Sequence, residues 1–296
     1  MLQIAYIREN KEEVVKKLAK KNLDAKAAID EVIALDEKRR ATQAELDTIK
    51  SESNKLSKDI GDLMKSGEKA KGEILKEKSV QLREKDKELM VKRDIDLLRY
   101  TGSKLHITGV SSATTIELVR AAKKEGLSIS CSVTPTHLFY CDEDMTTYNT
   151  NLKVIPPVRT KADREALRVA VVDGTIDCIA SHHAPQDWDH KVCEFEYAEF
   201  GNIGLQTTYA TLEQTIPGLK PDQISNLLSG NARRIFDLPT VTIQAGQAAE
   251  LTIFNRTEMT TLTPENNKSK SSNSAFMNQS LTGKVIATIN KGILTN

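Results

Sequence analysis

Residues 104–135, KLHITGVSSATTIELVRAAKKEGLSISCSVTP, contain two short apolar runs with a helical pattern between them. The runs at 104–110 and 127–135 are rich in Ile, Val, Ser and Thr and end at turn residues, which favours β-strands. Residues 113–125 place apolar side chains one turn apart and stop before Gly126, as an amphipathic helix with a glycine stop does. This stretch therefore predicts a strand, a helix and a second strand.

The same alternation continues farther along the chain. A helical pattern at residues 161–172 precedes a third apolar run at 175–183, TIDCIASHH. Strands that alternate with helices indicate β/α units and a parallel sheet or barrel. Histidine and other polar residues follow these runs, and the C-terminal ends of barrel strands are where active sites lie.

The first third of the chain has a different composition. Residues 11–98 contain no proline and consist mainly of good helix formers and charged residues. The a/d spacing of a coiled coil connects Leu46, Ile49, Ser53, Leu56, Ile60 and Leu63. After a turn at 64–68 that contains Gly67, Leu75, Leu82 and Leu89 recur every seven residues. We predict a long antiparallel helical hairpin, with residues 1–23 as a small helical foot.

The join between these two regions lies near residues 89–100. Because neither proline nor glycine interrupts residues 90–100, we expect the second hairpin helix to continue into the segment before the first strand. The predicted fold class is α plus α/β: a coiled-coil hairpin (1–98), a partial (β/α) barrel of the TIM type (99–240) and a small C-terminal β-region (241–296).

Composition excludes several classes of protein. Lys and Arg number 42 against 41 Asp and Glu, so the net charge of +1 gives no whole-chain field toward nucleic acid. The N-terminus is broken by charges and no run reaches transmembrane length, so we expect neither a signal peptide nor a membrane span. The four cysteines form no Cys-x-x-Cys pair, which argues against a disulfide framework or a zinc knuckle and favours a cytoplasmic location.

LDEKRRATQAELDTIKSESNKLSKDIGDLMKSGEKAKGEI and the N-terminal MLQIAYIRENKEEVVKKLAKKN resemble the tRNA-binding arm and N-terminus of bacterial seryl-tRNA synthetases. The resemblance covers about residues 1–89 and implies contact with the backbone and shape of a tRNA. The phosphate-binding candidates that it implies are Arg39, Arg40, Lys50, Lys55, Lys58, Lys65 and Lys69. Acidic residues share this region, so a solvated coiled coil that spaces or dimerises is the alternative. No counterpart of the synthetase's ATP and serine sites is present, so aminoacylation is not expected.

The second region resembles the C-terminal half of dihydroorotases, amidohydrolases of pyrimidine biosynthesis. The similar motifs, in family order, are 104–145, YNTNLKVIPPVRTKADREALRVAVVDGTIDCIASHHAP, GNIGLQT and GNARRIFDLP. The resemblance covers about residues 90–296. It implies an amidohydrolase barrel in which zinc, bound by histidines and a carboxylate at strand ends, polarises a cyclic amide.

Individual residues depart from that family pattern. The first-strand His-x-His pair has no counterpart, and the place of a third ligand histidine holds Gly109. The family's aspartate, a ligand and catalytic base, is replaced by His182; an imidazole is able to bind zinc, but it is a poorer proton shuttle here and cannot replace the missing ligands. Ile155 stands where an asparagine commonly contacts the substrate ring. We therefore assign no catalytic residue and no metal ligand, and we expect zinc only if a metal site survives.

The substrate-binding candidates that the resemblance leaves are His137, Asn151 and His183. Several histidines have simpler interpretations: His137 follows Thr-Pro-Thr and would cap a loop, and His106, which is not a site candidate, would be a hydrogen-bonded core residue. A cluster of His182, His183 and His190 with Asp187 and Asp189 would bind adventitious zinc or be a solvated loop.

The leading hypothesis is a catalytically inactive dihydroorotase-like part carried on a tRNA-binding type of hairpin. The alternatives are an RNA-binding protein, a homo-oligomer, and a scaffold that braces an aspartate carbamoyltransferase. If the chain is an enzyme, it is a zinc amidohydrolase of the dihydroorotase type.

Overall fold

The computed structural model describes residues 3–65 and 69–295. The chain divides into two compact units, one formed by residues 1–105 with 125–128 and the other by 106–124 with 129–296. The predicted turn at Gly67 lies outside the described residues. Within the described helices, no segment is apolar enough over a sufficient length to cross a membrane.

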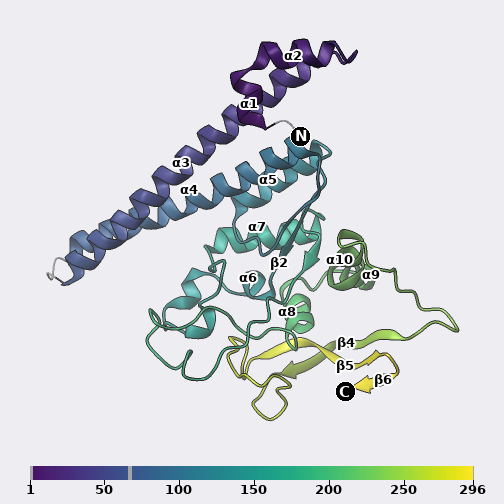
Figure 1. The fold of residues 1–296 in the computed structure, drawn as a ribbon. Helices are drawn as coiled ribbons and strands as arrows, with labels where there is room; N and C mark the ends of the chain where they lie inside the picture. The colour runs from purple at the N-terminus through teal and green to yellow at the C-terminus, as the bar shows by residue number, and fades with distance from the viewer. Residues whose placement is uncertain (1–2, 66–68, 296) are drawn as a thin grey trace. The chain divides into compact units, whose positions relative to one another are not determined.

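The first unit is a helical hairpin with a short helical foot (Figure 1). Its helices are α1 (Ile4–Glu9), α2 (Lys11–Ala19), α3 (Lys26–Lys65) and α4 (Lys69–Thr101). Leu46 and Ile49 of α3 are buried in one cluster with Leu89 of α4, and Leu82 packs against it. These four residues of the predicted heptad seam therefore form a hairpin core. Helix α4 crosses residues 89 and 90 without a break, so the predicted continuous helix at the join is confirmed.

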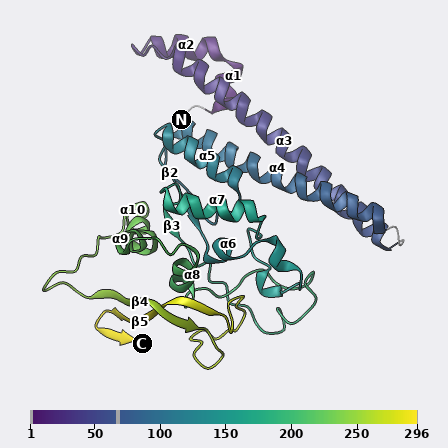
Figure 2. The ribbon, with the colours of Figure 1, turned by 180° about the vertical axis from the view of Figure 1, so that it is seen from behind.

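The second unit contains a three-stranded sheet of order β1-β2-β3; β2 and β3 are labelled in Figure 2. Its strands are β1 (Leu105–Ile107), β2 (Ile129–Val133) and β3 (Cys178–Ile179), and β2 and β3 are parallel. Helices α5 (Ala113–Lys124) and α7 (Lys161–Val172) pack against each other. Helix α7 begins at the N-cap Thr160, whose side chain accepts a hydrogen bond from the Asp163 backbone. The β/α alternation read from the sequence is confirmed, with strands shorter than the apolar runs.

Short helices connect the sheet to the rest of this unit. They are α6 (Pro135–Phe139), η1 (Asp142–Met145), η2 (Thr150–Leu152), α8 (Thr208–Thr215), α9 (Pro221–Ser225), η3 (Asn226–Gly230) and α10 (Asn231–Ile235). A core cluster beside α6 contains Tyr140, Leu152 and the almost fully buried Phe276. Phe276 belongs to the polar segment 266–280, which thus supplies a core residue although its composition is that of a loop.

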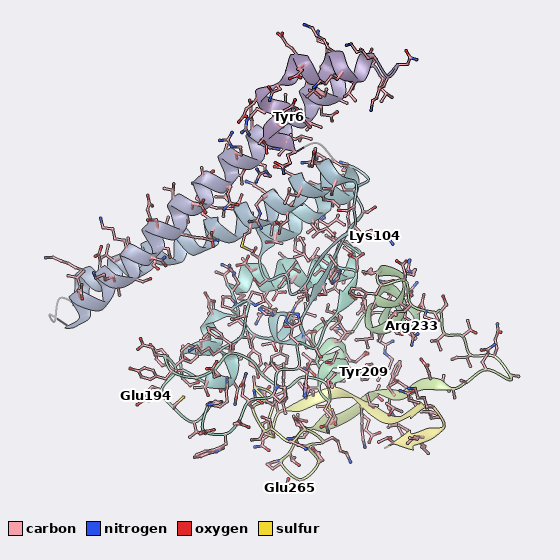
Figure 3. All side chains as sticks on the ribbon, in the orientation of Figure 1. Tyr6, Lys104, Glu194, Tyr209, Arg233 and Glu265 are labelled. Atoms are coloured by element: carbon pink, nitrogen blue, oxygen red, sulfur yellow. The ribbon has the colours of Figure 1, made fainter. Side chains whose placement is uncertain are left out.

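The C-terminal sheet is antiparallel and consists of β4 (Glu250–Thr261), β5 (Ser280–Asn290) and β6 (Ile293–Thr295). Helix α8, marked by Tyr209 in Figure 3, packs on this sheet. The ring centroids of Tyr209 and Phe254 are 4.5 Å apart. Gly283 has a φ of +97° and faces Glu213 at a distance that leaves little room for a Cβ. A side chain at position 283 would separate the helix from the sheet.

Candidate functional site

The site is a cavity of about 330 Å³ at the C-terminal ends of strands β2 and β3. Thr134 follows β2 directly and His182 follows β3, so the parallel strands bring both segments to one edge of the sheet. Active sites of barrels lie at this edge. The cavity is lined by Thr134, Thr136, His137, Val154, Ile155, His182, His183, Ala184, Phe200, Gly201 and Asn202.

His137 is held on both of its ring nitrogens. Nε2 lies 2.9 Å from the Pro156 carbonyl oxygen, which only accepts, so Nε2 carries the proton. Nδ1 then accepts from the Thr134 hydroxyl at 2.6 Å. Burial lowers the pKa of His137 to about 4, so the ring is neutral at pH 7. His137 lines the cavity, and the side chain that caps helix α6 is that of Thr134, which accepts from the His137 backbone N–H.

His182 occupies the space above Gly109. A Cβ built on Gly109 would lie 2.5 Å from Cε1 and 3.3 Å from Nε2 of His182. The His182 Nε2 is 3.0 Å from the Thr108 hydroxyl, and burial lowers its pKa. Gly109 has a φ of +70° and His182 a φ of +43°, so both residues have left-handed backbones. Gly109 and His182, the two departures from the dihydroorotase pattern, are therefore in contact. The His182 ring occupies the space that a side chain at position 109 would need.

His183 contributes a hydrogen-bond donor to the wall of the cavity. Its Nδ1 accepts from the Gly204 backbone N–H at 3.3 Å, so Nε2 is the ring nitrogen that donates. The residue also forms an isolated parallel bridge with Asn202. His183 lines this cavity and a smaller neighbouring one that contains Gln206 and Asn267.

Asn151 lies in η2 and is not among the residues that line the cavity. Its Oδ1 is buried without a hydrogen-bond partner. Ile155 does line the cavity and is 65% exposed, so it presents an apolar surface where an amide would donate and accept hydrogen bonds. The structure thus brings together His137 and His183, but not Asn151.

The cavity residues do not fit a zinc ion. A catalytic zinc needs three protein ligands and an open position, whereas Gly109 supplies no donor and His137 uses both nitrogens within the protein. In the described part of the chain, the group with metal-ligand spacing is instead Asp187, Asp189 and His190, all exposed. Exposed acidic groups of this kind are common without an ion, and the cluster does not include His182 or His183.

Among the cavity residues that the sequence interpretation missed are Phe200, Gly201 and Asn202. The Asn202 side chain donates to the Thr136 hydroxyl at 3.0 Å. Gly201 has a φ of +123° and faces the Ala184 Cβ, so only glycine fits there. Gly201 and Asn202 are the first two residues of the GNIGLQT motif. The resemblance of this motif to dihydroorotases was the sequence signal that could have identified them.

The phosphate-binding candidates of the hairpin differ in their surroundings. Arg39 binds the buried carboxylate of Asp36 through Nε and Nη2, at 3.2 and 2.9 Å. Four other candidates are exposed and, among the described residues, form no ion pair: Arg40, Lys50, Lys55 and Lys58. The side chains of Lys65 and Lys69 lie outside the described part of the structure.

Comparison with known proteins shows that two regions of the chain are similar to two different protein families. Residues 1–98 match the model of the seryl-tRNA synthetase N-terminal domain. The chain is 37% identical over 207 residues to a dihydroorotase of Syntrophus aciditrophicus, covering 69% of this chain and 49% of that protein. A dihydroorotase of Caldanaerobacter subterraneus is 40% identical over 208 residues, with coverages of 69% and 48%.

The chain therefore has one region similar to the seryl-tRNA synthetase N-terminal domain and a second region similar to dihydroorotases, as the sequence motifs predicted. The chain spans about half the length of the curated dihydroorotases that it matches.

Solved structures support the amidohydrolase fold. An L-hydantoinase (dihydropyrimidinase) from Arthrobacter aurescens superposes with a TM-score of 0.64 at 23% identity, over 71% of this chain and 48% of that one. The inactive dihydroorotase-like domain of a Chaetomium thermophilum CAD-like multifunctional protein gives 0.52 at 19% identity, over 69% and 54%. At these identities the likeness shows the fold.

Proposed function

We propose that the chain is a non-catalytic, dihydroorotase-like protein carried on a hairpin of the tRNA-binding type. The contact between His182 and Gly109 carries this proposal. Where the family pattern has a histidine ligand and a carboxylate, this chain has an imidazole packed over a glycine, 2.5 Å from where a Cβ would lie. A non-catalytic amidohydrolase fold has a parallel in the domain that is named inactive in the Chaetomium protein.

The chemistry of amide hydrolysis supports the same conclusion. Zinc hydrolases generate hydroxide near neutral pH and need a nearby base to move its proton. The lining residues of the cavity include no carboxylate. His137 is neutral and bound at both nitrogens, and His182 is directed to Thr108. No lining side chain is therefore placed to act as both ligand and base.

We expect the purified chain to show no dihydroorotate hydrolysis above the background of the buffer, with or without added zinc. The dihydroorotase of Syntrophus aciditrophicus, assayed in parallel, would establish the sensitivity of the measurement. A turnover that rises with zinc and disappears in His182→Ala would show that the site is catalytic and that the proposal is wrong.

RNA binding by the hairpin is a second candidate function, favoured by exposed basic side chains of α3 that form no ion pair with any described residue. At 3.6 residues per turn, Arg40 and Lys58 lie about five full turns apart, and Lys55 is one turn before Lys58. The same periodicity places them on the face opposite Leu46 and Ile49, which form the hairpin core. Exposed cations on one helix face are suited to the phosphates of a structured RNA.

Reversing Arg40, Lys55 and Lys58 to Glu in the full chain is expected to weaken tRNA binding by about tenfold or more. The slope of log K against log salt should fall by roughly 2 to 3, because each lost phosphate contact releases about one fewer counterion. Filter binding with serine tRNA over a salt series measures both. The matched control reverses three exposed lysines of the second unit, Lys161, Lys268 and Lys270. Equal losses in both variants, or no salt-dependent binding by the unmodified chain, would contradict the proposal.

Two protein partners are compatible with a non-catalytic role: a second copy of the chain and an aspartate carbamoyltransferase. Both stay proposals. Sedimentation of the purified chain, alone and mixed with a purified carbamoyltransferase, distinguishes a monomer, a homo-oligomer and a mixed complex.

A further inference from the structure

The loop between β3 and α8 contains a buried lysine that has no carboxylate partner among the described residues. Lys191 is 5% exposed. Its Nζ donates to three backbone carbonyls, those of Thr150 at 2.6 Å, Glu199 at 2.7 Å and Gly201 at 3.1 Å. An ammonium group has three donors, so all of them are satisfied. The loop is the one marked by Glu194 in Figure 3.

A charge in this position needs the carbonyl dipoles around it. Burying an ammonium group is costly unless polar atoms replace its water. Burial lowers the pKa of Lys191 to about 8, which still leaves the group mostly protonated at pH 7. Three convergent carbonyl oxygens supply the partial negative charge that a carboxylate would otherwise provide. The ammonium thus holds together segments that are distant in sequence, around residues 150 and 200.

The carbonyls that Lys191 binds flank a wall of the cavity. Glu199 and Gly201 lie on either side of Phe200, and both Phe200 and Gly201 line the cavity. Lys153 supports the same wall: its carbonyl accepts from the Gly201 N–H at 2.8 Å, and its Nζ lies 4.9 Å from the centroid of the Phe200 ring. The position of Phe200 therefore depends on the two carbonyls beside it.

We propose that Lys191 is the positioning residue of this cavity, a fixed internal cation around which the carbonyls of Thr150, Glu199 and Gly201 converge to place the Phe200–Gly201 wall. The role is independent of whether the chain hydrolyses any substrate. It also predicts a binding property: removal of the lysine side chain leaves three convergent carbonyl oxygens, which form a site for a small ammonium ion.

Hydrogen exchange of the full chain at pH 7 tests the positioning role. In Lys191→Met, which keeps the length of the side chain and removes its charge, the Glu199 and Gly201 amides should lose protection by about tenfold or more. The Ile116 amide in α5, which lies in the same unit, should be unchanged. Lys270→Met, at an exposed lysine, is the matched control and should leave all three amides unchanged.

Chemical rescue separates a fixed cation from general loop packing. In Lys191→Ala, ammonium or methylammonium chloride at about 0.1 M should restore protection of the Glu199 and Gly201 amides. Choline chloride at equal ionic strength should not restore it, because choline is too large to lie at hydrogen-bond distance from all three carbonyl oxygens. Protection in Lys191→Met within twofold of the unmodified chain would overturn the proposal. So would an equal loss at Ile116, which would mean general destabilisation, or equal rescue by choline.

Discussion

Replacing Gly109 with alanine is expected to destabilise the second unit by about 3 kcal/mol. About 1 kcal/mol of this arises from a non-glycine residue in the left-handed region. A further ~2 kcal/mol arises because the new Cβ would meet the His182 ring, which must turn away and lose its contact with Thr108. The clash distance of 2.5 Å to Cε1 is shorter than a real side chain tolerates. Urea unfolding followed by the fluorescence of Trp188, the single tryptophan, measures the change.

Two further variants separate the cost of the left-handed backbone from the cost of the clash with His182. Gly174 also has a left-handed backbone, with a φ of +79°, but no atom lies within 4 Å of its would-be Cβ, so Gly174→Ala should cost only about 1 kcal/mol. In a His182→Ala background, Gly109→Ala should likewise fall to about 1 kcal/mol. The difference is the coupling energy of residues 109 and 182. Additive effects would show that His182 does not occupy the space above Gly109.

Lowering the pH from 6.5 to 4 is expected to remove about 3 kcal/mol from the stability of the second unit through His137 alone. The pKa of His137 is about 4 in the folded protein and 6.5 ordinarily, so between these values the unfolded chain binds more protons. Stability is thus complete above pH 6.5 and is lost as pH falls toward 4. Each pKa unit corresponds to about 1.4 kcal/mol, which gives the expected size.

The contribution of His137 to the pH dependence is isolated by measuring the free energy of unfolding of two variants over the same pH range. His137→Gln keeps a donor for the Pro156 carbonyl but cannot gain a proton, so its stability should depend less on pH by about 3 kcal/mol. His190→Gln changes an exposed histidine and should retain the full pH dependence. If His137→Gln and the unmodified chain lose stability in parallel, His137 is not buried in neutral form.

Much of the fold was predictable because its signals are local. Leu46 and Ile49 follow the a/d spacing on one helix, and Leu89 ends a seven-residue repeat on the next, so these apolar stripes form a hairpin core where the two helices lie side by side. Helix α7 was predicted at its observed bounds, Lys161–Val172, because its helical pattern is local to that stretch of the sequence. Phe276 was not predicted to be buried because the polar residues around it are buried by tertiary contacts, which leave no local pattern.

The site was less accessible to sequence interpretation. The replacements at Gly109 and His182 were visible from the family resemblance, but their mutual contact follows from two left-handed backbones that only coordinates reveal. Asn151 was inferred from its motif, yet it does not line the cavity. Lys191 resembles any lysine in a polar loop, since its three acceptors are backbone carbonyls that have no sequence signature.

The zinc content of the purified chain, measured by elemental analysis after equilibration with equimolar zinc and dialysis, tests the central claim most directly. The absence of a fitting ligand set predicts far less than one zinc per chain. Any remainder should be lost in His190→Ala, because it belongs to the exposed group with Asp187 and Asp189. One or two zinc ions per chain, retained in His190→Ala and lost in His182→Ala, would instead show that the cavity is a working metal centre.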